Sequence, residues 1–118
     1  MAMIETRYKS KLVSTLRREG ALVLSLHGHA QQAPGWPDVY VCHSLWRGWI
    51  ELKKTGCLLS EAQRSVARKL AAFRLFVLLE VGGDDWYLRD HEECCIATVV
   101  PRCGVSLLRE IAQSLRAS

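Results

Sequence analysis

The chain has 118 residues, of which 49% are hydrophobic, and its formal net charge is +4. This length indicates a single domain over residues 1–118, and the apolar fraction is large enough to fill a core. No apolar run reaches the length of a membrane span, and the N-terminus lacks a signal-peptide pattern. We therefore expect one cytoplasmic domain with no membrane partner.

Residues 3–19 are predicted to form the first helix. Apolar residues recur there every four positions, at Ile4, Tyr8, Leu12 and Leu16. Gly20 follows as a C-cap glycine and ends the helix. Glu5 lies in the first turn, where a negative charge is favourable on its own account.

The next run, residues 21–27, is dense in aliphatic side chains. Such density predicts a strand that is buried on both faces. His27 and His29 lie at its end and just beyond it. A histidine there either assists proton transfer near pH 7 or simply bonds to the backbone, and both interpretations stay open.

The segment Pro34–Lys54 reads as a loop followed by two strands. The runs 39–42 and 49–53 are rich in β-branched and aromatic residues, which is typical of strands. Residues 43–48 are short enough to be a hairpin connection. The sequence therefore predicts an antiparallel pair directly after the Pro-Gly-Trp-Pro loop.

That pair is expected to assemble a metal site. Side chains alternate along a strand, so Glu51 and Lys53 share one face, and a partner beginning at Asp38 can bring a second carboxylate there. Two carboxylates, with the backbone carbonyl of Leu52 as a further ligand, suit a hard cation such as Mg²⁺ or Mn²⁺. The Lys53 ammonium would orient or deprotonate a water, or offset phosphate charge. The alternative is an ordinary turn followed by the solvated face of an edge strand.

Three tryptophans crowd the same segment, at Trp36, Trp46 and Trp49. At least one is expected in the core. Trp46 lies at the tip of the expected hairpin, where burial is harder. It is therefore a candidate to stack on a base, to wedge into a DNA junction or to pack against a second subunit.

Residues 60–73 are predicted to form a second helix. Ser60 and Gln63 have the spacing of a capping box, and Val66, Leu70 and Phe73 are expected to line one face. The apolar run 75–81 then predicts a buried strand. A strand, helix and strand in succession imply parallel pairing through a crossover connection.

The remaining segment, 82–118, begins with a turn at 82–85. Short strands are expected at 86–88 and 96–100, and a last helix at 105–116. This C-terminal segment is expected either to complete the fold or to form a dimer surface.

Charge is unevenly distributed along the chain. Residues 1–20 hold five basic and two acidic side chains, residues 50–74 hold six and two, and residues 75–95 hold one and six. Basic segments flanking the expected metal site suit a surface that faces phosphates, with an acidic face opposite. The alternative is a set of ordinary solvated helix faces.

The five cysteines, an odd number, exclude a complete disulfide framework. No Cys-x-x-Cys pair occurs, and Cys94-Cys95 with His91 has no second pair at zinc-ligand spacing. Reduced thiols packed as small hydrophobes are the preferred interpretation.

Three short motifs together carry a resemblance. Gly35-Trp36-Pro37-Asp38, Ile50-Glu51-Leu52-Lys53 and Leu59-Ser60-Glu61-Ala62-Gln63 resemble, in order and spacing over about residues 5–80, the VRR-NUC family of PD-(D/E)xK nucleases. Stand-alone members of this size look like phage or bacterial enzymes. The resemblance implies an α/β fold of the restriction-endonuclease-like kind, with an αβββαβ core and a small mixed sheet flanked by helices.

The resemblance also implies a metal-dependent DNA endonuclease with no small-molecule cofactor. Glu5 would be an auxiliary metal ligand and Gln63 would lie near the active site, beside the catalytic set of Asp38, Glu51 and Lys53. Branched DNA, such as a Holliday junction, is the expected substrate, and a homodimer the expected assembly. The candidate DNA contacts are His27, His29, Lys54, Arg64, Arg68 and Trp46.

Three alternatives remain at this stage. The chain could be a general, flap or nicking nuclease of the same fold. It could be a non-catalytic nucleic-acid-binding module whose acids are structural. It could also be a small interaction or regulatory protein that uses its tryptophans and its last helix.

Overall fold

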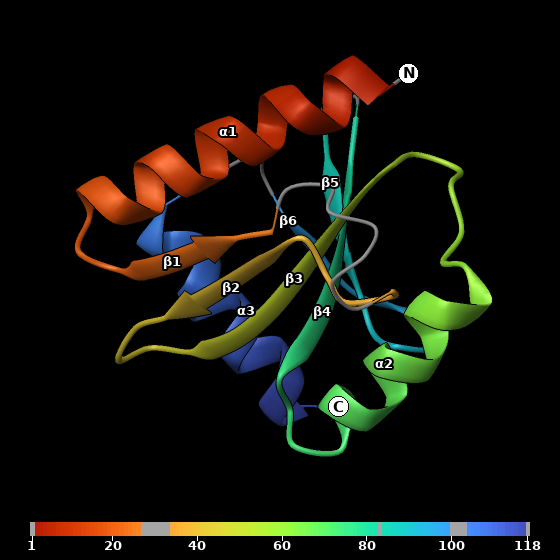
Figure 1. Cartoon of the computed structure of the whole chain (residues 1–118). Helices are drawn as coiled ribbons and strands as arrows, with labels where there is room; N and C mark the ends of the chain where they lie inside the picture. Colours follow the sequence, from red (N-terminus) through yellow and green to blue (C-terminus); the bar gives the residue numbers. More distant parts are fainter. Residues whose placement is uncertain (1, 27–33, 83, 100–103, 118) are drawn as a thin grey trace.

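A computed structural model describes residues 2–26, 34–82, 84–99 and 104–117, with side chains from residue 7 onward. Its elements, in chain order, are α1 (Ala2–Arg18), β1 (Leu22–Ser25), β2 (Val39–Cys42), β3 (Arg47–Lys54), α2 (Glu61–Ala71), β4 (Phe76–Val81), β5 (Trp86–Arg89), β6 (Cys95–Val99) and α3 (Val105–Ala117). Figure 1 shows these helices and strands along the chain. The fold is therefore α/β, as expected.

The strands form one six-stranded mixed sheet in the order β1-β2-β3-β4-β5-β6. Strands β3 and β4 pair in parallel, with Trp49 beside Phe76 and Lys54 beside Val81. Every other neighbouring pair is antiparallel. The parallel pairing predicted from the strand–helix–strand pattern is confirmed, because α2 connects β3 to β4.

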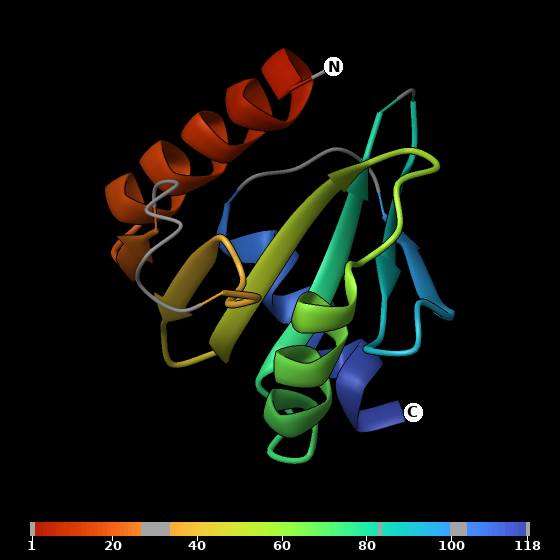
Figure 2. The ribbon, with the colours of Figure 1, turned by 45° about the vertical axis from the view of Figure 1, so that its right-hand side comes forward.

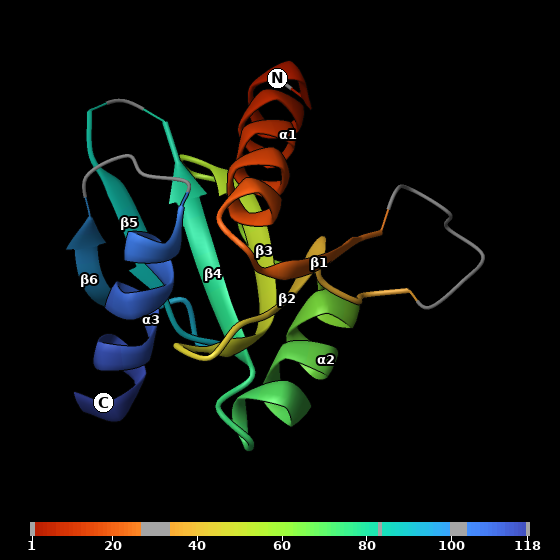
Figure 3. The same cartoon turned by 90° about the vertical axis from the view of Figure 1, so that its left-hand side faces the viewer.

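The helices lie on both faces of the sheet. Helix α2 covers one face, and α1 and α3 lie on the other (Figures 2 and 3). Alternation along β4 divides the core accordingly. Val77, Leu79 and Val81 pack in the larger cluster with α1 and α3, whereas Phe76 and Leu78 pack with Leu59 and Ala67 on the α2 side.

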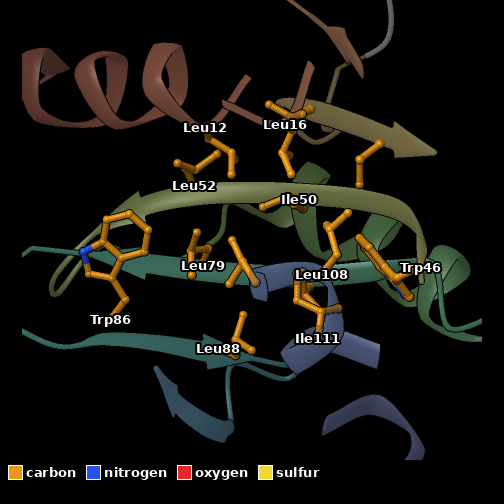
Figure 4. Packing of buried hydrophobic residues seen from close by; sticks show 14 of the residues in the cluster. Leu12, Leu16, Trp46, Ile50, Leu52, Leu79, Trp86, Leu88, Leu108 and Ile111 are labelled. Atoms are coloured by element: carbon orange, nitrogen blue, oxygen red, sulfur yellow. The ribbon is translucent and has the colours of Figure 1, made fainter. Parts of the chain in front are cut away.

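The larger core shows why α1 takes its position. Leu12 and Leu16 are buried against Ile50 and Leu52 of β3 (Figure 4). Gly20 ends the helix as predicted: its φ is +98°, a conformation that glycine adopts without steric cost.

Strand β1 differs from the sequence-based expectation of a strand buried on both faces. It is an edge strand, paired only with β2 among the described residues, and its Leu22 and Leu24 are 74% and 53% exposed. Helix α2 lies over β3 and β4 and does not extend across β1 (Figure 2). Aliphatic density alone cannot distinguish a central strand from an edge strand whose outer face is apolar.

Helix α2 begins as predicted and ends earlier. The Ser60 hydroxyl accepts the Gln63 N–H at 3.2 Å, and the Gln63 side chain accepts the Ser60 N–H at 2.8 Å, which completes the capping box. The helix stops at Ala71, and Phe73 is 74% exposed in the turn that follows. The prediction that Phe73 lies on the buried helix face is therefore wrong.

The C-terminal segment completes the fold. Strands β5 and β6 extend the sheet beyond β4, and Leu107, Leu108 and Ile111 of α3 are buried in the larger core. Trp86 of β5 also makes a T-shaped contact with Tyr8 on α1, with ring centroids 5.1 Å apart. In the described part of the chain, no helix is long and apolar enough to cross a membrane.

The cysteines behave only partly as expected. The four described ones, Cys42, Cys57, Cys94 and Cys95, are free thiols, but Cys94 and Cys95 are exposed and are not packed as small hydrophobes. Cys103 lies outside the described residues.

Candidate active site

The loop before β2 is held tightly in place, and this fixes the position of Asp38. Gly35 has φ +89°, and a Cβ on it would collide with the backbone carbonyl of Ala62 in the first turn of α2. Trp36 packs against Trp49 of β3, with ring centroids 5.2 Å apart. The loop is therefore packed between the start of α2 and the face of β3.

Asp38, directly before β2, lies opposite Glu51 of β3. Val39 is paired with Ile50, so the antiparallel register places Asp38 across from Glu51. Asp38 is anchored by its backbone and its side chain. Its carbonyl accepts the Leu26 N–H at 2.9 Å, and its Oδ2 accepts the Leu52 N–H at 3.1 Å.

Glu51 is the one buried charged residue in the described part of the chain, with 4% of its surface exposed. Burial, assisted by the charge of Asp38, raises the pKa of Glu51 from its ordinary value of 4.5 to about 8, although Lys53 acts in the opposite direction. Hydrogen bonding between the two carboxyl groups also raises this pKa. The pair therefore disfavours two simultaneous negative charges in the absence of a cation.

Lys53 and Gln63 complete the surroundings of Glu51. Lys53 Nζ lies 3.9 Å from Glu51 Oε2, and both side chains project from the same face of β3. Gln63 Nε2 donates to the same Oε2 at 3.2 Å while Gln63 Oε1 is held by the Ser60 N–H. The Gln63 side chain therefore caps the helix and contacts Glu51 at the same time.

Lys9 of α1 also reaches this site, and the sequence analysis missed it. Its Nζ lies 3.8 Å from Asp38 Oδ1 and donates to the Leu26 carbonyl at 2.9 Å. One signal was available: Lys9 follows Glu5 by four residues, so the two share a helix face. If Glu5 is expected to point toward the site, Lys9 should be expected there as well.

The backbone of Leu52 is oriented toward the Asp38 side of β3. Its N–H donates to Asp38, and the N–H and C=O of one strand residue point the same way. The Leu52 carbonyl is thus directed toward the same edge. No group of three or more His, Cys, Asp or Glu side chains with metal-site geometry occurs among the described residues. Any cation there would rely on the two carboxylates together with backbone, amide or water oxygens.

The candidate DNA contacts on β3 and α2 have different surroundings. Lys54 projects from the face of β3 opposite Lys53, away from the carboxylate pair. Arg64 Nε lies 3.1 Å from Glu93 Oε1, and Glu93 also accepts the Leu59 N–H, so one acid of the segment 75–95 lies against the start of α2. Arg68 is exposed on α2.

Trp46 is not available to stack on a base. It is 9% exposed, and its Nε1 donates to the Arg74 carbonyl at 3.3 Å. Its ring lies over Gly48, where a Cβ would collide with it. The expected exposure of Trp46 is therefore wrong. The glycine lets this aromatic ring fold back onto β3 immediately after the hairpin.

Three other candidates cannot be placed. His27 and His29 lie outside the described residues, and for Glu5 only the backbone, within α1, is described. Their assignment stays a prediction.

Comparisons of the chain with protein-family models, with curated proteins and with solved structures give no match. The functional interpretation therefore depends on the residues and geometry of this chain alone.

Proposed function

We propose that the chain is a metal-dependent endonuclease that hydrolyses the phosphodiester bonds of DNA. Asp38, Glu51 and Lys53 would form its active site. One observation carries the proposal: Glu51 is buried opposite Asp38, with its pKa raised to about 8 and Lys53 at 3.9 Å. Burying an acid beside a second acid is unfavourable for folding, and such strongly perturbed groups cluster at functional sites.

The chemistry of these groups fits a hard divalent cation. Mg²⁺ and Mn²⁺ prefer oxygen ligands. The carboxylates of Asp38 and Glu51 and the backbone carbonyl of Leu52 are ligands of this kind. A cation held by Asp38 and Glu51 would offset the repulsion that raises the pKa of Glu51. When bound, such an ion polarises a phosphoryl oxygen and lowers the pKa of a water.

The side chains of the chain then have separate roles. Lys53 is close enough to Glu51 to hold the attacking water, or to donate to a non-bridging phosphate oxygen, at the face where the carboxylates meet. Gln63 donates to the same Glu51 oxygen and fixes the orientation of this carboxylate. Lys9 does the same for Asp38. In the reaction the water oxygen attacks phosphorus, the bond to the leaving oxygen breaks, and that oxygen takes up a proton.

We further propose that the chain belongs to the VRR-NUC family and has its restriction-endonuclease-like core. The element order of residues 2–81, a helix, three strands, a helix and a strand, supports this proposal. The same resemblance favours branched DNA as substrate and a cytoplasmic phage or bacterial enzyme. Junction resolution also implies a homodimer, since two symmetric nicks need two sites related by a two-fold axis.

Cleavage of defined DNA structures tests the proposal. A labelled four-way junction is compared with linear duplex, flap and single strand of the same sequence, in Mg²⁺, Mn²⁺ and EDTA. Glu51→Gln and Lys53→Ala are assayed beside Glu61→Gln and Lys11→Ala, which alter exposed helix residues. Light scattering of the protein with and without the junction gives the oligomeric state.

We expect metal-dependent paired nicks in the junction, lost in the first two variants and retained in the two controls. Cutting of every substrate would support the assigned catalytic site and reject the preference for junctions. Absence of cutting under all conditions, or cutting that all four variants retain, would reject the nuclease proposal.

A further inference from the structure

A groove lies between α1 and the edge strand β1, which run side by side in Figure 1. It encloses about 330 Å³ and is lined by Lys9, Ser10, Val13, Ser14, Arg17 and Ser25. Two of these residues are cationic, three carry hydroxyl groups, and the described lining includes no carboxylate. Such a groove suits an anion with several acceptor oxygens.

The groove approaches Asp38 from the α1 side of the sheet, whereas Glu51 faces α2. Lys9, at one end, lies 3.8 Å from Asp38. Arg17, at the other end, is eight residues further along α1, which corresponds to about 12 Å at a rise of 1.5 Å per residue. Because the charges of one DNA strand repeat every ~3.4 Å of helix axis, a groove of this length spans more than one phosphate.

Both cations keep donors available for a ligand. Lys9 Nζ donates to the Leu26 carbonyl, and Arg17 Nη2 donates to the Val23 carbonyl at 2.8 Å. A lysine has three N–H donors and an arginine five, so neither is used up. The Arg17 contact also occupies an outward-facing carbonyl of the β1 edge, which disfavours pairing of this edge with another strand.

Ser25 lines the groove from β1. Ser25 Oγ is buried and has no hydrogen-bond partner among the described residues. Buried hydroxyls nearly always have one, so the packing of α1 on β1 leaves this polar group unsatisfied. Ser10 and Ser14 line the groove from α1 and are exposed to solvent.

We propose that this groove binds the sugar-phosphate backbone of DNA beside the scissile phosphate, with Lys9 and Arg17 as its phosphate contacts. This inference rests on the proposed nuclease function. It makes α1 the element that guides the strand into the site. It also gives Lys9 a second function, since one ammonium would connect Asp38 with the neighbouring phosphate.

The test is DNA binding by the full chain carrying Glu51→Gln, which prevents turnover, measured by fluorescence anisotropy over a range of salt concentrations. Into this background are introduced Ser14→Glu, which puts a negative charge in the groove, and Arg17→Gln. The matched controls are Ser106→Glu, at an exposed position on α3, and Arg18→Gln, the exposed neighbour of Arg17 that does not line the groove. Thermal unfolding of every variant checks that the edge of β1 remains intact.

We expect Ser14→Glu to weaken DNA binding about tenfold, and Arg17→Gln to reduce the slope of log K against log salt by about 0.9, the value for one lost phosphate contact. The controls should match their background in affinity and slope. Binding by the background protein that neither groove variant changes would overturn the groove and leave the nuclease intact. If the protein with Glu51 restored neither binds nor cuts DNA, the proposed function and this inference both fail.

Discussion

The side-chain amide of Gln63 joins the first turn of α2 to Glu51. Its Oε1 accepts the Ser60 N–H at 2.8 Å, and its Nε2 donates to Glu51 Oε2 at 3.2 Å. One side chain thereby fixes the start of the helix and orients the buried carboxylate. The two roles can be separated, because the Ser60 hydroxyl takes part only in the cap.

Ser60→Ala should therefore destabilise the protein without impairing the site. Loss of an N-cap hydroxyl costs about 1 kcal/mol of unfolding free energy. Gln63→Glu should impair cleavage while keeping the helix cap. A glutamate at this position still accepts the Ser60 N–H but cannot donate to Glu51. Urea unfolding and single-turnover cleavage measure the two effects. Comparable activity in both variants would show that the amide donor to Glu51 is dispensable.

Glu51 predicts how the stability of the metal-free protein depends on pH. Its pKa in the folded chain is about 8, against 4.5 ordinarily, so the folded state binds more protons than the unfolded state between these values. Unfolding free energy should therefore fall as pH rises from about 4.5 to about 8, and level off above that range. Glu51→Gln should remove this slope and be the more stable protein at pH 8. Urea titrations in EDTA at several pH values measure it, and parallel curves for the two proteins would contradict the prediction.

Mg²⁺ should reverse that trend. A cation binds the deprotonated carboxylate, so its affinity and the stabilisation it gives should both increase as pH rises toward 8. The rise in melting temperature on adding Mg²⁺ should be larger at pH 8 than at pH 6. Glu51→Gln should show no such rise, and Glu61→Gln should behave as wild type. An equal rise in Glu51→Gln would place the cation elsewhere.

The elements that carry the candidate site could be predicted because local chemistry specifies them. The β-branched and aromatic residues of 39–42 predicted β2, and the alternation around Glu51 predicted β3. The Ser60–Gln63 spacing predicted the start of α2. The parallel pairing of β3 and β4 followed from the intervening helix. In each case the determining interactions lie within a few residues or in one crossover connection.

The features that the sequence-based predictions missed depend on contacts between segments far apart in the chain. Nothing near Leu22 or Leu24 indicates that β1 has no covering helix on its outer face. Pairing of Arg64 with Glu93 joins residues on α2 to the turn after β5, far apart in the sequence. The approach of Lys9 to Asp38 likewise depends on how α1 packs on β1 and β3.

Gly35 should be required for activity without touching a substrate. A side chain there meets the Ala62 carbonyl, and φ +89° is strained for any residue with a Cβ. Gly35→Ala should therefore displace the loop that leads into Asp38. We expect a loss of stability of about 1–3 kcal/mol and a fall in cleavage rate. Gly56→Ala is the matched control: its φ is +86°, but a Cβ there meets no atom, so it should retain the cleavage rate.

Trp46 provides a final test that separates packing from DNA recognition. Its indole N–H donates to the Arg74 carbonyl and its ring covers Gly48, so it secures the hairpin between β2 and β3 to the start of β4. Trp46→Phe should lower the unfolding free energy by about 1–3 kcal/mol, through the lost hydrogen bond and the space left behind. At temperatures where the variant remains folded, its KM for DNA should be unchanged. Trp36→Phe, which alters an exposed ring, should have the smaller effect on stability. A raised KM in Trp46→Phe with no loss of stability would restore the idea that this tryptophan contacts DNA.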